Sequence, residues 1–209
     1  MVLGEPVAEA EVVAEFLRAE IESPRFGPRI RARLAQDGRP ETIIERPDTS
    51  SDEDNAYRAA LLHGYRGVGG SAPLLEGLPD RMEWYRARLT RADLERVRYI
   101  EYPYWVELSA GTRSPAVAAS RIRAGITAMN RPNDAFLAVS ARLCAGEQLG
   151  TTVLVAPDPS AALVVLEGHT RVTAMLLRPE CMPAEVPMLV GFAAGVREWP
   201  YYGSPDGGS

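Results

Sequence analysis

The sequence contains no lysine, and all 23 of its basic residues are arginines. A Walker A phosphate-binding loop, a Schiff-base enzyme and a protein-kinase-type site are therefore excluded, because each depends on a lysine side chain. Any phosphate chemistry must use arginines, backbone N–H groups and helix N-termini. The 28 acidic residues give a net charge of −5, which argues against general nucleic-acid binding through a basic face.

The sequence also has few cysteines and no long apolar run. Cys144 and Cys181 lie far apart and form no CxxC pair. Isolated thiols of this kind usually behave as small buried hydrophobic residues in a reducing compartment. No apolar run reaches the roughly 18 residues of a membrane span, and the acidic start of the chain is unlike a secretory signal. We therefore expect a cytoplasmic protein with no membrane partner and no metal site built from cysteine and histidine.

Apolar residues make up 46% of the 209 residues, which is enough for the core of a globular domain. Apolar spacing predicts helices over residues 5–22, 28–35 and 55–63, with a mobile acidic loop over residues 38–54. The glycine-rich residues 64–71 are interpreted as a surface loop, with a phosphate-binding loop as the alternative.

The second half of the chain alternates between helical and extended patterns. Thr90 and Asp93 predict a capping box, and the aromatic-rich segment that follows is expected to be extended. Helices are predicted over residues 91–96, 114–124, 134–145 and 171–177, and strands over 98–106, 151–155, 163–166 and 186–192. This pattern predicts an α+β fold with a small mixed β-sheet flanked by helices.

We divide the chain into three parts on this basis. Residues 1–96 form a helical N-terminal region that includes the acidic loop. Residues 97–192 form the α+β domain, and residues 193–209 form a C-terminal tail that is frayed from Tyr201 onward.

Glu167, Gly168, His169, Thr170 and Arg171 connect a predicted strand to a predicted helix, and we call them the 167–171 turn. Glycine permits a sharp turn, and the free N–H groups and dipole of the helix start favour an anion there. Thr170 and Arg171 would contact phosphate oxygens, and His169 would donate to the anion or move a proton near neutral pH. The alternative is an ordinary strand–turn–helix connection without a ligand.

The 167–171 turn and the Val172-Thr173-Ala174 that follows resemble the signature turn of the ParB/sulfiredoxin superfamily. The order of the flanking elements is also similar, so the resemblance covers residues 97–192 and implies a ParB/sulfiredoxin-like fold. Sulfiredoxins carry a cysteine between the glycine and the histidine, which this chain lacks. Chromosome-partitioning ParB proteins carry a helix-turn-helix domain after the nucleotide fold, for which residues 193–209 leave too little room.

The motif is most similar to that of the free-serine kinases of this superfamily, although Thr170 stands where they often have a second histidine. The resemblance implies a nucleotide-dependent phosphotransferase that acts on a small hydroxyl-bearing molecule such as free serine. ATP, ADP or CTP would be the cofactor, its phosphates held by Gly168, His169, Thr170 and Arg171. A Mg²⁺ ion held by Glu107, Glu167 and the phosphates is consistent with such chemistry.

Phosphoryl transfer also needs a carboxylate to take the hydroxyl proton. Glu107, expected at a strand end, and Glu167 are the candidate bases, with Glu101 as a rival; a solvated loop acid is the alternative for Glu107. Arg113 and Ser114 are expected at a second helix N-terminus that meets the same phosphates. The nearby aromatic residues fit core packing, with stacking on a nucleobase as the alternative: Tyr99, Tyr102, Tyr104 and Trp105.

Two further functions stay open at this stage. The chain fits a non-catalytic nucleotide- or anion-binding module that works through a protein partner, and a ParB-like nucleic-acid-associated protein. The acidic balance weighs against the second. The sequence leaves room for a homodimer.

Overall fold

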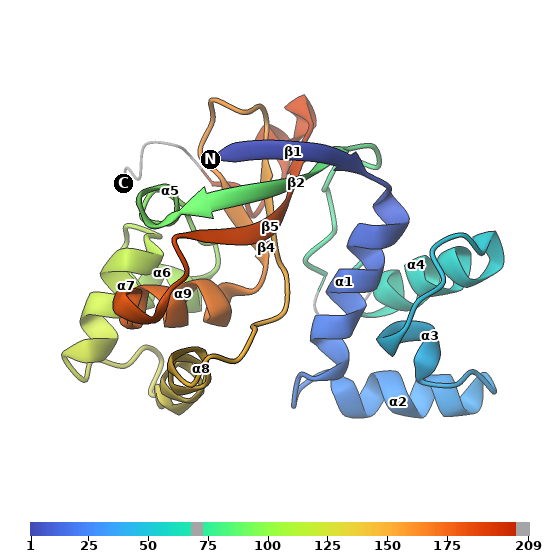
Figure 1. The fold of residues 1–209 in the computed structure, drawn as a ribbon, viewed down its shortest axis with the longest axis horizontal. Helices are drawn as coiled ribbons and strands as arrows, with labels where there is room; N and C mark the ends of the chain where they lie inside the picture. The colour runs from blue at the N-terminus through green and yellow to red at the C-terminus, as the bar shows by residue number, and fades with distance from the viewer. Residues whose placement is uncertain (68–72, 204–209) are drawn as a thin grey trace. The chain divides into compact units, whose positions relative to one another are not determined.

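The computed structural model describes residues 1–67 and 73–203 of the chain. The fold is α+β, and its described residues contain a five-stranded mixed sheet and nine α-helices (Figure 1). The predicted class and the mixed sheet are confirmed. The chain divides into two compact units, one of residues 7–76 and one that joins residues 1–6 to residues 77 onward. This division differs from the boundary expected near residue 96.

The unit of residues 7–76 is helical, as Figure 1 shows. Its helices are α1 (Glu9–Ile21), α2 (Gly27–Gln36), α3 (Thr42–Glu45) and α4 (Asp52–Arg66). The loop expected over residues 38–54 contains α3 and the first turn of α4, which Ser51 caps by accepting from the Asp54 N–H. The glycine-rich stretch is split: Gly64 lies within α4, whereas residues 68–72 lie outside the described residues.

Arginines connect the helices of this unit from the inside. Arg58 is fully buried and donates to the carbonyl oxygens of Ile43 at 3.1 Å and Asp48 at 2.8 Å. Burial lowers the pKa of this guanidinium. Arg66 pairs with the buried Glu20. A short helix and a loop are thereby fixed against α4 by hydrogen bonds rather than by apolar packing alone.

The other unit is built on the sheet, whose strand order is β1-β2-β5-β3-β4. Strand β5 is antiparallel to β2 and parallel to β3, and β3 is antiparallel to β4. The strands are β1 (Val2–Val7), β2 (Glu83–Thr90), β3 (Thr152–Ala156), β4 (Val164–Glu167) and β5 (Glu185–Phe192). The last three match predicted strands. The first two lie where we expected helix or loop.

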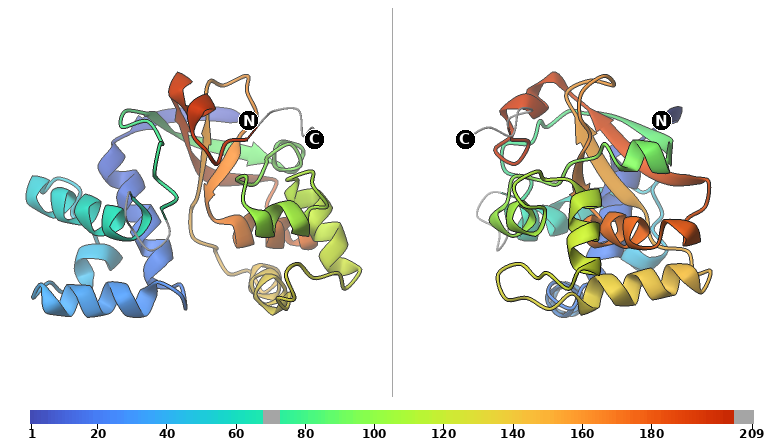
Figure 2. Two further views of the ribbon diagram at one scale, coloured as in Figure 1. Left: turned by 180° about the vertical axis from the view of Figure 1, so that it is seen from behind. Right: turned by 90° about the vertical axis from the view of Figure 1, so that its left-hand side faces the viewer.

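Five helices accompany this sheet, and α6 to α9 gather on one of its faces (Figures 1 and 2). They are α5 (Arg91–Leu94), α6 (Pro103–Leu108), α7 (Pro115–Arg123), α8 (Asp134–Cys144) and α9 (His169–Leu177). The core between sheet and helices is apolar and includes Leu154 and Met188 from the strands and Leu108 and Val172 from the helices. The capping box of Thr90 and Asp93 is present as predicted.

The prediction of a strand over residues 98–106 is wrong. Only Arg98 pairs with the sheet, through an isolated parallel bridge to Val164. Pro103 then begins α6 rather than interrupting a strand. Proline suits the first turn of a helix because the N–H that it lacks would have no intrahelical partner there.

The tail expected from residue 193 is ordered as far as residue 203, where the description ends. It forms a 3-10 helix, η2 (Ala194–Glu198). Val196, Trp199 and Tyr202 are buried, so this segment belongs to the core and is not frayed.

The prediction of two isolated thiols is also wrong. Cys144, at the end of α8, and Cys181, just after α9, form a disulfide with their Cα atoms 4.9 Å apart. The two residues are 37 positions apart in sequence, and nothing in the local pattern indicates their pairing. Within the described residues, no helix is long and apolar enough to cross a membrane. The cytoplasmic location stays a prediction, and the cysteines no longer support it.

Breaking the disulfide should destabilise the protein. It closes a loop of 37 residues, and such a cross-link typically adds about 2–4 kcal/mol to the free energy of unfolding. We expect reductant to lower that free energy by this amount in urea unfolding of the wild-type protein. The Cys144→Ser/Cys181→Ser variant should already be destabilised and insensitive to reductant. Equal stability of the wild type with and without reductant would contradict a closed disulfide.

Candidate functional site

The 167–171 turn is positioned by the pairing of two short strands. Strands β3 and β4 are antiparallel, with Val153 opposite Glu167 and a shift of register between Val153 and Leu154. Thr152, the first residue of β3, thereby comes next to Gly168. The start of one strand and the end of its neighbour thus lie side by side, although they are separated along the chain.

Gly168 has a left-handed backbone, with φ of +97°. A Cβ atom here would lie 2.6 Å from Thr152 Oγ1 and 3.0 Å from Arg171 Nη2, so only glycine fits without displacing them. Helix α9 begins directly afterwards, at His169 instead of Arg171. Gly168 is the N-cap residue, and no side chain caps the helix. Thr170 therefore lies in the first turn of the helix.

Arg171 and Glu167 form an ion pair across this first turn, and their side chains are 17% and 15% exposed. Arg171 Nη2 also donates to the carbonyl oxygen of Thr151 at 2.7 Å. These contacts hold the guanidinium beside Gly168. Arg171 Nε and Thr152 Oγ1 are buried without a hydrogen-bond partner, and Thr152 is only 1% exposed. Arg58 Nε and Ser140 Oγ share this property elsewhere in the described residues, so the pair is distinguished by its place, with both residues beside Gly168.

The ring of His169 stacks on Trp105, with centroids 4.7 Å apart and planes inclined by 13°. The ring centroids of Tyr99 and Trp105 are also 4.7 Å apart. The Tyr99 hydroxyl forms a hydrogen bond with the hydroxyl of Thr173, one turn after His169. Tyr99 is fully buried, and burial raises the pKa of its hydroxyl above the ordinary value. The aromatic residues therefore brace the start of α9 from within the core. Tyr102 is the exposed one.

The carboxylates predicted as rivals of Glu167 lie in other surroundings. Glu107 is an exposed residue within α6, not at a strand end, and its carboxylate accepts from the Met129 N–H at 2.9 Å. Glu101 is exposed and pairs with Arg113 at 3.3 Å. Among the described residues, neither carboxylate forms a hydrogen bond or ion pair with the 167–171 turn. Glu167 is the acid that the structure places at the turn itself.

Arg113 and Ser114 serve a different purpose from the predicted one. The Arg113 guanidinium is buried and donates to the carbonyl oxygens of Tyr99, at 2.7 and 2.9 Å, and of Tyr202. Burial lowers its pKa. The Ser114 hydroxyl caps α7 by accepting from the Val117 N–H. These hydrogen bonds are to groups of the protein itself, so both residues build the fold around α6 and α7.

The sequence analysis missed Thr152 and the carbonyl group of Thr151. Nothing in the local sequence links residues 151 and 152 to the turn. Thr152 comes next to the turn only because β3 pairs with β4 in antiparallel fashion. The one sequence signal for this pairing is that two neighbouring apolar segments are joined by a proline-containing turn. Within residues 1–67 and 73–203, no group of three His, Cys, Asp or Glu side chains is arranged to hold a metal ion.

Comparison with known proteins does not assign the site. No protein-family model, no curated protein and no solved structure matches this chain. The interpretation of the site therefore rests on its own geometry.

Replacement of Gly168 by alanine tests how closely the turn is packed. Gly146 is a matched control, because its φ of +84° carries the same backbone strain while its surroundings are open. We expect Gly146→Ala to cost about 1–2 kcal/mol, the penalty of a left-handed residue with a Cβ atom. Gly168→Ala should cost more, because the new methyl group displaces Thr152 or Arg171. Equal losses in thermal or urea unfolding would show that the turn has room to spare.

Proposed function

We propose that the 167–171 turn binds the phosphate groups of a nucleotide and that the protein is a phosphotransferase for a small hydroxyl-bearing molecule such as free serine. The proposal includes a ParB/sulfiredoxin-like fold for the sheet unit. It rests chiefly on the two buried polar atoms that flank Gly168 without a partner, Thr152 Oγ1 and Arg171 Nε. A phosphate oxygen at this place would accept from both.

The surroundings of these atoms favour an anion. Helix α9 spans nine residues, and its N-cap is a glycine with no side chain to accept from the first-turn N–H groups. Such a helix start carries a partial positive charge and free donors. The absence of lysine leaves this arrangement, with Arg171, as the means by which the chain would neutralise phosphate.

Each residue of the turn has a defined part in the proposal. The Gly168 backbone would let the phosphate approach, and the N–H groups of His169 and Thr170, in the first turn of α9, would donate to it. Arg171 is held in place by Thr151 and Glu167, so little side-chain entropy is lost when it binds. His169 is oriented by its stacking on Trp105.

Glu167 is the better candidate for the base that takes the hydroxyl proton, because it lies at the turn. To act as a base, Glu167 must first be released from its ion pair with Arg171. A bound phosphate would release it by competing for the Arg171 guanidinium. Glu107 would need to release the Met129 N–H and reach the site from α6. A Mg²⁺ ion would be coordinated chiefly by phosphate oxygens and water, as this ion prefers.

Thr152→Val separates binding from stability. The hydroxyl that it removes has no partner in the protein, so the variant should unfold at the same temperature as the wild type or higher. Its affinity for ATP, ADP or CTP should fall by about tenfold or more, as for one lost hydrogen bond to a charged group. Calorimetric titration with each nucleotide measures the affinity. Unchanged affinity for every nucleotide that binds would remove Thr152 from the site.

The two carboxylates can be separated by activity. We expect Glu167→Gln to abolish phosphate transfer to serine, because an amide cannot accept the proton, while nucleotide binding persists. Glu107→Gln is the matched comparison and should retain transfer. The measurement is phosphorylated product formed from labelled nucleotide and free serine. If only Glu107→Gln is inactive, the base lies on α6; if the wild type forms no product with any hydroxyl compound, the catalytic part of the proposal is wrong.

A non-catalytic nucleotide-binding module is the second candidate. The observation that favours it is the ion pair of Glu167 with Arg171, which occupies the acid needed as a base. This candidate predicts that nucleotide raises the melting temperature without being consumed. The same binding and turnover measurements therefore distinguish the two.

A further inference from the structure

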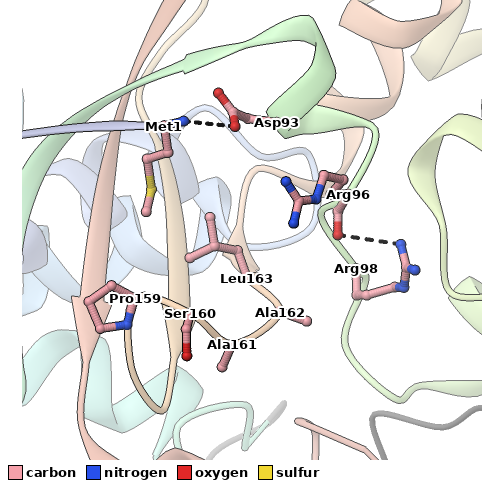
Figure 3. A pocket seen from close by; sticks show the side chains of 9 residues that line it. All are labelled: Met1, Asp93, Arg96, Arg98, Pro159, Ser160, Ala161, Ala162 and Leu163. Carbon is pink, nitrogen blue, oxygen red and sulfur yellow. Dashed lines mark hydrogen bonds and ion pairs between the residues drawn. The ribbon is translucent and has the colours of Figure 1, made fainter.

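A pocket of about 430 Å³ lies in the sheet unit at the end of β4 opposite to the 167–171 turn. Figure 3 shows it between α5 and the loop that joins β3 to β4. We call it the arginine pocket, and its lining residues are Met1, Asp93, Arg96, Arg98, Pro159, Ser160, Ala161, Ala162 and Leu163. The volume is within the range of small-molecule sites.

The charge of the arginine pocket is mainly positive. Arg96 and Arg98 form no ion pair with any acid among the described residues, and the Arg98 guanidinium makes only two long bonds, to the carbonyl oxygens of Arg96 at 3.4 Å and Val97 at 3.3 Å. Figure 3 shows Arg96 reaching toward the middle of the pocket and Arg98 turned back toward the Arg96 carbonyl. Arg96 is therefore placed for direct contact, and Arg98 adds charge at the edge.

The acids near the pocket are already engaged. Asp93 lies 2.7 Å from the amino nitrogen of Met1 and accepts from the N–H and hydroxyl of Thr90 at 2.9 and 2.8 Å. Burial opposes its ionisation, but these hydrogen bonds outweigh burial and lower its pKa. Asp158, at the start of the neighbouring loop, pairs with Arg197 at 2.8 Å. Neither carboxylate is left to neutralise Arg96.

The walls of the pocket are held in place without a ligand. The Arg98 N–H donates to Leu163 O at 2.8 Å, and Arg98 O accepts from the Val165 N–H at 2.9 Å. On the other side, Asp158 accepts from the N–H groups of Ser160 at 2.9 Å and Ala161 at 3.1 Å, which fixes the loop. A preformed wall lowers the entropy that binding must overcome.

We infer that the arginine pocket binds a small organic anion, with its phosphate or carboxylate group on Arg96 and its apolar part against Leu163 and Pro159. A guanidinium presents a planar set of donors that matches both kinds of anion. The site is separate from the 167–171 turn, since the two lie at opposite ends of β4. It would therefore recognise a second compound, not the nucleotide phosphates.

Calorimetric titration of the full-length protein with phenyl phosphate, benzoate and benzyl alcohol tests this inference. We expect one or both anions to bind and the neutral alcohol to bind at least about tenfold more weakly, as for the loss of a charge-assisted contact. Arg96→Gln should weaken anion binding by about tenfold and Arg98→Gln by less. Ala162→Trp, which fills the pocket and keeps both arginines, should abolish binding.

A further arginine serves as the control. Arg178 is an exposed residue at the end of α9, and Arg178→Gln should leave anion binding unchanged. The inference is overturned if neither anion binds, if benzyl alcohol binds as tightly as the anions, or if Arg178→Gln weakens binding as much as Arg96→Gln does. It is also overturned if Ala162→Trp, folded as judged by its melting temperature, binds normally.

Discussion

Hydrogen bonds from arginine side chains to backbone carbonyl oxygens hold the irregular parts of both units. Arg58 fixes the loop before α4, Arg113 joins residue 99 to the C-terminal segment, and Arg123 donates to the last carbonyl groups of α9 at 2.9 and 3.2 Å. Arg171 does the same for Thr151. A guanidinium has five donors and stays charged when buried, so one side chain can satisfy several carbonyl groups that would otherwise be costly to bury. Arginine, as the only basic residue type besides histidine, thus has a structural part in the fold.

The same interaction assigns different roles to arginines that look equivalent in sequence. Arg113 and Arg171 both lie next to the start of a helix. Arg113 has its donors directed at carbonyl groups and at Glu101, whereas Arg171 keeps a buried Nε–H without a partner. Of the two, only Arg171 has a buried donor without an acceptor. Arg113 completes the protein interior, and Arg171 is the arginine to which we assign a ligand in the proposed phosphate site.

The sequence predicted most of the sheet unit from residue 114 onward, because its helices carry clear start and stop residues such as Ser114 and Gly146. It missed β1 and β2. In β2 the inward-facing Tyr85, Ala87 and Leu89 alternate with arginines, a pattern too short and too charged to stand out. It singled out the turn as the candidate site but not Thr152 as a neighbour of that turn. Strand register and disulfide pairing are properties of contacts between distant residues, which composition and periodicity do not encode.

The disulfide has a consequence for how the turn assembles. Its ring runs from residue 144 to residue 181 and so contains both Thr152 and the whole 167–171 turn. In an unfolded chain with this disulfide closed, the ends of the segment cannot move apart. The effective concentration of the β3 residues around the β4 residues is therefore higher than in an open chain. Thr152 and the 167–171 turn thus come together within a small closed loop during folding. The disulfide at the ends of α8 and α9 thereby favours the correct register of β4, a strand of only four residues.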